Sequence, residues 1–297
     1  MSLDPNRAKG CLLGLAVGDA LGTSLEFKPP GSFEPLTDMR GGGPFNLQPG
    51  AWTDDTSMAL CLVDSLLETG WDPTDQMQRY CRWWHQGYRS STDRCFDIGN
   101  TVSSALHRFE LSGDPMSGST DPYSAGNGSL MRLAPIPLFF HADNQLAEQR
   151  AAEMSCTTHA APSCVDACRY TTRLIIQLLH GLEKEAALKA AAQTPELCPE
   201  IQEVAEGSFR VRQPPEIKGS GYVVKSLEAA LWAFHHSSDF KTGALLAVNL
   251  GDDADTTGAI YGQIAGAAYG IDAIPATWME RIVHYQEIVE MGIQLSL

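Results

Sequence analysis

The sequence predicts an all-α protein, folded as a compact single-domain bundle of many helices. Apolar residues recur with the 3.6-residue helical period through most of the chain, as in residues 55–68, where Met58, Leu62 and Leu66 fall on one face. Period-two alternation, which would indicate β-strands, is scarce. No change of composition along the chain resembles a linker between domains, so we expect residues 1–297 to form one domain.

The helical pattern recurs in order along the chain, and long segments rich in Gly and Pro separate its parts. After 55–68 it predicts helices at 74–87, 98–111, 144–156, 164–182, 222–236 and 275–290. The Gly- and Pro-rich segments predict loops at 28–52, 112–128 and 207–221. Each of these loops is long for a compact domain, and loops of such length are often functional.

Two segments near the ends of the chain carry a glycine at every fourth residue. They are Gly10, Gly14, Gly18 and Gly22 in the first and Gly258, Gly262, Gly266 and Gly270 in the second. At this spacing the glycines line one face of a helix, although each costs about 1 kcal/mol relative to alanine. Very close approach of another helix would compensate for that cost. We therefore expect both helices in the core, packed against each other.

Composition and charge exclude several classes of protein. With 43% apolar and 19% charged residues the chain is typical of a globular protein. Its net charge of −15 disfavours nucleic-acid binding, because neutralising the phosphate backbone requires Lys and Arg. No stretch approaches the ~18–20 consecutive apolar residues of a membrane span, and the first residues do not resemble a secretory signal. We therefore expect a cytoplasmic protein without a membrane span.

The eight cysteines are scattered through apolar helical segments, which favours reduced thiols packed in a core. Cys156, His159, Cys164 and Cys168 have a spacing that permits a zinc site. Two of these cysteines, however, lie four residues apart on one predicted helix, with a proline shortly before it. We therefore favour ordinary packing of the cysteines, with a separate role for His159.

Two predicted helices begin with clustered aspartates. Thr53-Asp54-Asp55-Thr56 precedes a long amphipathic helix, and Asp253-Ala254-Asp255-Thr256 opens the second glycine-spaced helix. One Asp would be enough to cap each helix, so two in each segment exceed that need. Carboxylate and hydroxyl oxygens without His or Cys select hard ions such as Mg²⁺ or Mn²⁺. If the two helix starts converge, they can bind two ions, whereas spacing alone leaves capping open as the alternative.

A series of motifs carries a resemblance that covers nearly the whole chain in order. The motifs are Gly14–Gly22 followed by Glu26-Phe27, Thr53–Thr56, Phe96–Asn100, Gly126–Arg132, Thr158-His159, Gly221-Tyr222 and Asp253–Thr256. Together they resemble the ADP-ribosylglycohydrolase family, which includes the dinitrogenase reductase-activating glycohydrolases and the ADP-ribosyl-acceptor hydrolases.

The resemblance implies a metal-dependent hydrolase that removes ADP-ribose from modified protein side chains, above all ADP-ribosyl-arginine, by cleaving the N-glycosidic bond at ribose C1′. It implies two Mg²⁺ or Mn²⁺ ions, with ligands drawn from Thr53, Asp54, Asp55, Asp253, Asp255 and Thr256. It implies substrate contacts from Gly99, Asn100, Ser124, Gly126, Asn127, Gly128, His159 and Tyr222. The implied catalytic residues are Glu26, Asp55 and Asp97, and which of them steers the attacking water stays open.

The residues add one observation of their own. Gly126-Asn127-Gly128 precedes an apolar run, so it can present free backbone donors to phosphate oxygens at a helix start, although a plain loop-to-helix turn is the alternative. The sequence also departs from the family that it resembles, because Asp252 stands where many members of that family have a glycine. Its carboxylate is either a partner of the metal ligands or solvated.

Three other functions stay open from the sequence. Serine-linked ADP-ribose or O-acetyl-ADP-ribose could replace the arginine conjugate as substrate. A metal-dependent phosphohydrolase could use the same carboxylates to cleave the pyrophosphate and release AMP. A non-catalytic ADP-ribose-binding protein could share the fold, although retention of the acidic residues argues against it.

Overall fold

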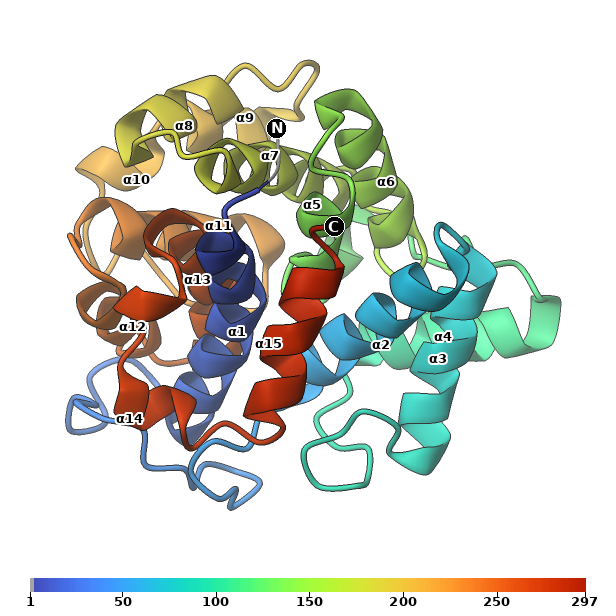
Figure 1. Cartoon of the computed structure of the whole chain (residues 1–297), viewed down its shortest axis with the longest axis horizontal. Coiled ribbons are helices and arrows are strands. Elements are labelled where there is room, and N and C mark those ends of the chain that lie inside the picture. Colours follow the sequence, from blue (N-terminus) through green and yellow to red (C-terminus); the bar gives the residue numbers. More distant parts are fainter. Residues whose placement is uncertain (1–2) are drawn as a thin grey trace.

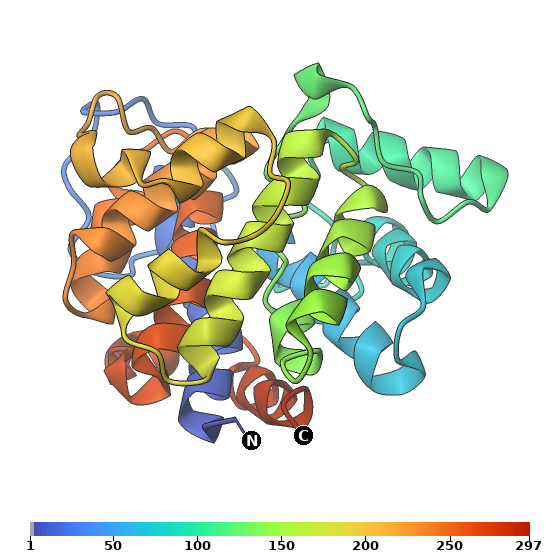
Figure 2. The ribbon, with the colours of Figure 1, turned by 90° about the horizontal axis from the view of Figure 1, so that it is seen from above.

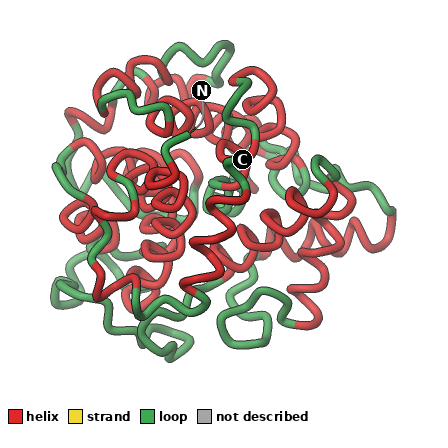
Figure 3. The backbone as a smooth tube through the Cα atoms, viewed as in Figure 1, coloured by secondary structure: helices red, strands yellow, loops and turns green. Residues whose placement is uncertain are grey.

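The computed structural model describes residues 3–297, and within them it contains helices and loops but no β-strand (Figures 1 and 3). The all-α prediction is confirmed. In chain order the elements are α1 (Pro5–Gly22), η1 (Thr23–Leu25), α2 (Asp54–Thr69), α3 (Pro73–Gln86), α4 (Asn100–Ser112), η2 (Pro122–Ser124), α5 (Pro135–Phe139), α6 (Asn144–Cys156), α7 (Pro162–Leu179), α8 (Lys184–Ala191), α9 (Pro199–Ala205), α10 (Ser208–Val211), α11 (Val223–His235), α12 (Phe240–Val248), α13 (Ala254–Tyr269), η3 (Ile271–Ala273), α14 (Ala276–Met279) and α15 (Tyr285–Gln294). None of the described helices is long and apolar enough to cross a membrane.

Helices α1 and α13 form the centre of the molecule and run antiparallel through their glycine faces (Figure 1). A Cβ atom added to Gly18 would lie 1.9 Å from the carbonyl oxygen of Gly258, and one added to Gly262 would lie 1.9 Å from that of Gly14. Only glycine allows backbones to approach this closely. The prediction that the two glycine-spaced helices pack against each other is confirmed.

The remaining helices surround this central pair in two groups. Helices α11, α12 and α7 pack on α13, α15 packs on α1, and α6 and α8 pack on α7. Helices α2, α3 and α4 enclose a second, smaller apolar core that includes Met58, Tyr80, Trp83 and Leu106. In Figure 2 this second group projects away from the central pair. Helix α2 joins the two groups, because its first turn lies beside the central pair and its apolar face covers the second core.

The helix ends follow local sequence signals. Asp72 caps α3 by accepting hydrogen bonds from the backbone N–H groups of Thr74 and Asp75, and Pro73 occupies the first helical position. Helix α3 ends at Gly87, whose φ of 70° is the left-handed conformation that glycine adopts without strain. Such signals explain why the predicted bounds of α2, α3, α4, α6 and α11 lie within two residues of the observed ones.

The helix predicted at 275–290 is wrong, because the chain there forms two separate helices, α14 and α15. Between them Val283 donates a backbone hydrogen bond to Gly50 (3.0 Å), and His284 adopts a left-handed φ of 57°. A tertiary contact with the loop at 28–52 therefore interrupts an otherwise helical pattern. The loop predicted at 207–221 also differs, because it contains the short helix α10.

Candidate active site

The two acidic helix starts converge in the structure. The Thr53 hydroxyl, immediately before α2, lies 3.1 Å from Asp55 Oδ2 and 3.4 Å from Asp255 Oδ2. The Thr256 hydroxyl in the first turn of α13 lies 3.4 Å from Asp55 Oδ2. Residues about 200 positions apart in the sequence thus share one buried site. Because both helices point their N-termini at this site, their dipoles favour the negative charge gathered there.

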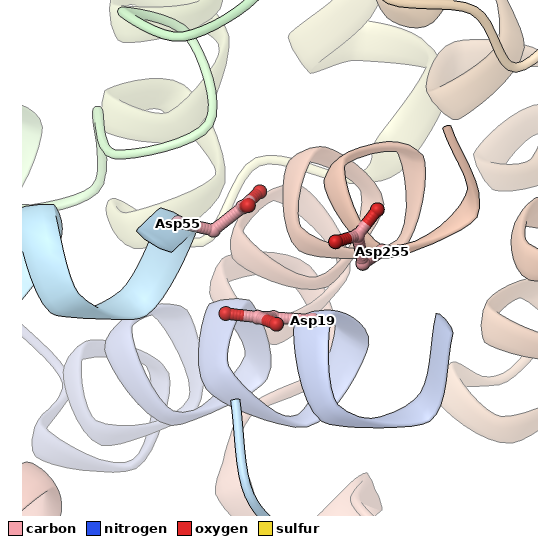
Figure 4. Close-up of side chains that lie close together, drawn as sticks. All are labelled: Asp19, Asp55 and Asp255. Atoms are coloured by element: carbon pink, nitrogen blue, oxygen red, sulfur yellow. The ribbon is translucent and has the colours of Figure 1, made fainter. Parts of the chain in front are cut away.

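A third carboxylate at this site, Asp19, was not among the predicted site residues. It lies on α1, is fully buried, and points toward the same region as Asp55 and Asp255 (Figure 4). Its oxygens accept hydrogen bonds from the backbone N–H groups of Thr53 (2.9 Å) and Thr56 (3.1 Å). They also accept hydrogen bonds from both threonine hydroxyls. Since Thr53 makes no side-chain cap of its own, Asp19 caps α2 from a different helix.

We expect Asp19→Asn to lower the free energy of unfolding by about 1–3 kcal/mol, because the amide NH₂ would face donors that now find a carboxylate oxygen. Urea denaturation at neutral pH measures the loss. The matched control is Asp4→Asn at the N-cap of α1, where asparagine caps as well as aspartate and the change should be within about 0.5 kcal/mol. Equal effects of the two substitutions would contradict the remote cap.

The carboxylates form two groups that share one residue. Ligand oxygens of Asp19, Asp55 and Asp255 all lie within 4.8 Å of one another, and so do those of Glu26, Asp97 and Asp255. Glu26 follows the short helix η1, and Asp97 lies in the loop before α4 with a left-handed φ of 60°. The Cys156, His159, Cys164 and Cys168 set forms no such group among residues 3–297, and all eight cysteines are free. The interpretation of these cysteines as packed thiols stays a prediction.

The donor set fits a hard divalent cation. Glu26 Oε2, Asp55 Oδ1 and Asp255 Oδ1 are buried acceptors without a hydrogen-bond partner among the described residues. Leaving such atoms unpaired is costly, and cations at the two carboxylate groups would satisfy Asp55 Oδ1 and Asp255 Oδ1, which leaves Glu26 Oε2 for a water or a substrate group. Burial, reinforced by Asp97, Asp253 and Asp55, raises the pKa of Glu26 to about 10. Burial also raises the pKa of Asp97 to about 7 and those of Asp54, Asp55 and Asp255 well above the usual range. These clusters can hold metal ions.

Without metal ions we expect the free energy of unfolding to fall as pH rises. In the folded state, carboxyls with raised pKa values keep protons that the same carboxyls release near pH 4 in the unfolded chain. This extra proton binding favours the folded state at low pH, and its contribution to the free energy of unfolding is lost as the pH rises through the folded-state pKa values. These are about 6 for Asp19, 7 for Asp97 and 10 for Glu26. Urea denaturation in EDTA across this range measures the slope, and saturating Mn²⁺ should flatten it. A stability that rises with pH in EDTA would contradict the prediction.

A cavity of about 660 Å³ opens above the carboxylates. The predicted site residues in its lining are Glu26, Asp54, Asp97, Gly99, Asn100, Gly126, Asn127, Gly128, His159, Asp253, Asp255 and Thr256. Four predicted site residues lie outside the lining. Thr53 and Asp55 are fully buried behind it. Ser124, the last residue of η2, donates from its hydroxyl to the carbonyl of Asp121, and Tyr222 lies at the start of α11 with 41% of its surface exposed.

The glycine turn at 126–128 connects the cavity to the acidic site. Asn127 donates from its side chain to Asp253 Oδ2 (2.8 Å) and from its backbone to the carbonyl of Gly221 (3.0 Å). The expectation of a helix start here is wrong, because residues 128–132 form successive turns and α5 begins only at Pro135. Proline favours a first helical position, which places the helix start after this segment.

The predicted site residues leave out the apolar wall and the rim of the cavity. The additional lining residues are Phe27, Ile98, Thr101, Val102, Met131, Ser220, Gly221 and Asp252. Phe27, Ile98, Met131 and Gly221 stand inside the motifs of the resemblance, and Asp252 precedes the second acidic helix start. No local signal distinguishes Thr101, Val102 or Ser220. Asp252 contacts the loop through its backbone, donating to the carbonyl of Lys28 (2.8 Å) and accepting from the N–H of Phe27 (2.7 Å).

The chain matches known proteins over almost its whole length. It is 42% identical to the ADP-ribosylarginine hydrolase Tri1 of Serratia proteamaculans, with 99% of this chain and 79% of that protein aligned. It is 33% identical to the ADP-ribosyl-[dinitrogen reductase] glycohydrolase of Rhodospirillum rubrum, with 93% and 90% aligned. A solved structure described as an ADP-ribosylglycohydrolase-related protein complex superposes with a TM-score of 0.89 at 43% identity, covering 98% of this chain and 97% of that one. The pattern of the ADP-ribosylglycohydrolase family matches residues 2–296, and the chain is a hydrolase that belongs to this family.

Proposed function

We propose that this protein releases ADP-ribose from modified arginine side chains by hydrolysing the N-glycosidic bond at ribose C1′, with two Mg²⁺ or Mn²⁺ ions. The observation that carries the proposal is the pair of carboxylate groups that share Asp255 beneath the cavity. The arginine linkage is supported by two relatives at 42% identity, from Serratia proteamaculans and Pseudomonas putida, both named ADP-ribosylarginine hydrolases.

The proposed metal ligands are drawn from Thr53, Asp54, Asp55, Asp253, Asp255 and Thr256, to which the geometry adds Asp19. When bound, the ions would supply Lewis-acid polarisation and compensate the charge of an anionic substrate. This compensation matters because the net charge of −15 and the buried carboxylates would otherwise repel the pyrophosphate of ADP-ribose. Asp255 belongs to both carboxylate groups, so it is the residue suited to serve both ions.

The chain's own residues would handle the proton and the substrate. Cleavage at C1′ passes through an oxocarbenium-like state, so the surrounding carboxylates stabilise the positive charge that develops on the ribose. As the oxygen of water bonds to C1′ and the C–N bond breaks, Glu26 Oε2 would take the water proton while the guanidine leaves. Asp97 shares this corner of the site with Glu26. The turn at 126–128 and the start of α4 at Gly99 and Asn100 would hold the phosphate and ribose groups.

We further propose that residues 1–297 act as one domain. Helix α1 at the beginning of the chain packs against α13 and α15 near its end, so the site draws on both ends. Glu26 and Asp97 lie between them along the sequence, and both contribute to the group that contains Asp255.

Incubation of the purified protein with Mn²⁺ and an ADP-ribosyl-arginine protein, followed by mass analysis, tests this function. We expect metal-dependent release of intact ADP-ribose with unmodified arginine restored. Release of AMP would identify a phosphohydrolase instead. Turnover only of serine-linked ADP-ribose or O-acetyl-ADP-ribose would move the proposal to that linkage, and binding of ADP-ribose without turnover of any conjugate would identify a binding protein.

We expect Glu26→Gln to lower kcat by about 10²–10⁴-fold while the protein still binds ADP-ribose, because the amide cannot accept the proton. Steady-state kinetics and calorimetric binding measure the two effects separately. The matched control is Glu34→Gln, an exposed residue of the loop at 28–52, which should keep the activity of the parent. Full activity of the Glu26 variant would assign proton transfer to Asp55 or Asp97.

A further inference from the structure

Arg132 is a fully buried cation whose hydrogen bonds all go to uncharged oxygens. It donates to the carbonyls of Gly128 (2.6 Å) and Met154 (3.5 Å), and to the hydroxyls of Thr157 (3.3 Å) and Thr158 (2.7 Å). No carboxylate of the described residues forms an ion pair with it. A buried charge without a counter-ion is expensive, so a role beyond packing is expected of this residue.

A chain of two hydrogen bonds joins Arg132 to the histidine of the cavity. Arg132 Nη2 lies 2.7 Å from Thr158 Oγ1, and that oxygen lies 2.8 Å from His159 Nδ1. A guanidinium can only donate, so the hydroxyl accepts from it. The oxygen could accept a second time from Nδ1, but among the described residues Nδ1 is the one acceptor bonded to this hydroxyl, so donation to Nδ1 is the arrangement that leaves the hydroxyl proton paired. A neutral imidazole whose Nδ1 accepts carries its proton on Nε2. The contacts thus favour the Nε2–H tautomer of His159.

The Nε2 edge of His159 faces the glycine turn of the cavity lining. A Cβ atom added to Gly126 would lie 3.3 Å from Nε2, and one added to Gly128 would lie 3.1 Å from it. Glycine at both positions therefore leaves space around this edge of the ring. Burial and the nearby Arg132 lower the pKa of His159 to about 3, which keeps the ring neutral at physiological pH.

We propose that Arg132 and Thr158 are positioning residues that hold His159 as the neutral Nε2–H tautomer, so that it donates a hydrogen bond to a phosphate oxygen of ADP-ribose. Arg132 also bonds to the carbonyl of Gly128, so the same cation orients the turn that borders the phosphate group. One hydroxyl separates Arg132 from the lining residue His159, so its positive charge favours an anionic ligand in a cavity whose charged lining residues are all carboxylates. The position of the proton follows from the contacts, whereas the contact with ADP-ribose rests on the proposed function.

The tautomer can be measured on the unmodified protein. In long-range ¹H–¹⁵N spectra of the ¹⁵N-labelled protein at neutral pH, His159 should show a protonated Nε2 and an unprotonated Nδ1, with its signals assigned by their loss in His159→Asn. The opposite tautomer, or a charged ring, would overturn the inference. This measurement needs no variant of Arg132 or Thr158 to fold.

Substitutions of the adjacent Thr157 and Thr158 then test whether the hydrogen bonds from Arg132 through Thr158 hold the tautomer of His159. Thr158→Val removes the hydroxyl that bonds to Nδ1, so His159 should lose its fixed tautomer and ADP-ribose should bind about tenfold more weakly. Thr158→Ser should keep the tautomer and the affinity. Thr157→Val is the matched control, because it also removes a buried hydroxyl bonded to Arg132 but does not contact His159.

The outcomes distinguish the control of the His159 tautomer by Arg132 and Thr158 from the proposed function. The inference would be overturned if Thr158→Val kept the tautomer and the ADP-ribose affinity of the unmodified protein. It would also be overturned if Thr157→Val lost the tautomer and the affinity to the same extent as Thr158→Val. If the unmodified protein binds no ADP-ribose although His159 carries its proton on Nε2, the phosphate contact and the proposed function fail together. The inference that Arg132 and Thr158 hold the tautomer of His159 would still be supported in that case.

Discussion

Replacing Asp255 with asparagine should reduce kcat at least about a thousandfold, which corresponds to about 4 kcal/mol of transition-state stabilisation. Asp255 is the residue common to both carboxylate groups, and its Oδ1 is a buried acceptor without a hydrogen-bond partner among residues 3–297. Asparagine has the same shape but no negative charge, so it would bind a divalent cation weakly in this position. Release of ADP-ribose from an ADP-ribosyl-arginine protein at saturating Mn²⁺ measures the loss.

The same substitution should raise the stability of the metal-free protein. Burial and the neighbouring Glu26, Asp55 and Asp253 raise the pKa of Asp255 well above its usual range, so this carboxyl destabilises the fold when it is ionised. Thermal unfolding in EDTA should therefore give a higher Tm for Asp255→Asn than for the parent, and added Mn²⁺ should raise the Tm of the parent much more than that of the variant. A loss of activity through misfolding would instead lower the Tm in EDTA.

Asp252→Asn is the control for this experiment. Asp252 lies three residues away at the rim of the cavity, belongs to neither carboxylate group, and contacts the loop through its backbone. We therefore expect its variant to keep its activity within about tenfold, which would identify the Asp252 carboxylate as solvated. Activity of Asp255→Asn at the level of Asp252→Asn would contradict the assignment of Asp255 as the shared ligand.

Gly262→Ala should destabilise the protein by about 3 kcal/mol or more, although alanine is the better helix former by about 1 kcal/mol. The added Cβ would lie 1.9 Å from the carbonyl oxygen and 2.6 Å from the carbonyl carbon of Gly14. Both are backbone atoms of α1, so no side chain can move aside, and the central helix pair must separate. Domains are stable by about 5–15 kcal/mol, so this loss is a large share of the total.

Denaturant unfolding measures this effect, and the direction of the change is decisive. The control is Ala268→Gly, near the end of the same helix and only partly buried, where loss of the methyl group should cost about 1 kcal/mol through helix propensity. A higher midpoint for Gly262→Ala would mean that the two helices do not approach as closely as the structure shows. Separation of α1 from α13 should also displace Asp19 from the start of α2, so activity should fall with stability.

The sequence by itself determined the features that depend on neighbours within one or two helical turns. The period of the apolar residues predicted the all-α fold, and the four-residue spacing of Gly258, Gly262 and Gly266 predicted a face of close helix contact. Paired aspartates at two helix starts exceeded the needs of capping and indicated a metal site, and the order of the motifs indicated the family. Apart from the order of the motifs, which spans the chain, these signals are local, because periodicity and capping act between residues near in sequence.

Only the tertiary structure decided which residues meet. Asp19 resembles an isolated polar residue on a glycine-rich helix, and its role depends on a helix start more than 30 positions away. The break before α15 depends on the carbonyl of Gly50, and the tautomer of His159 depends on the distant Arg132. Convergence of Asp55 with Asp255 likewise depends on how closely α1 and α13 pack. Distances between residues far apart in sequence are set by packing, and no local pattern encodes them.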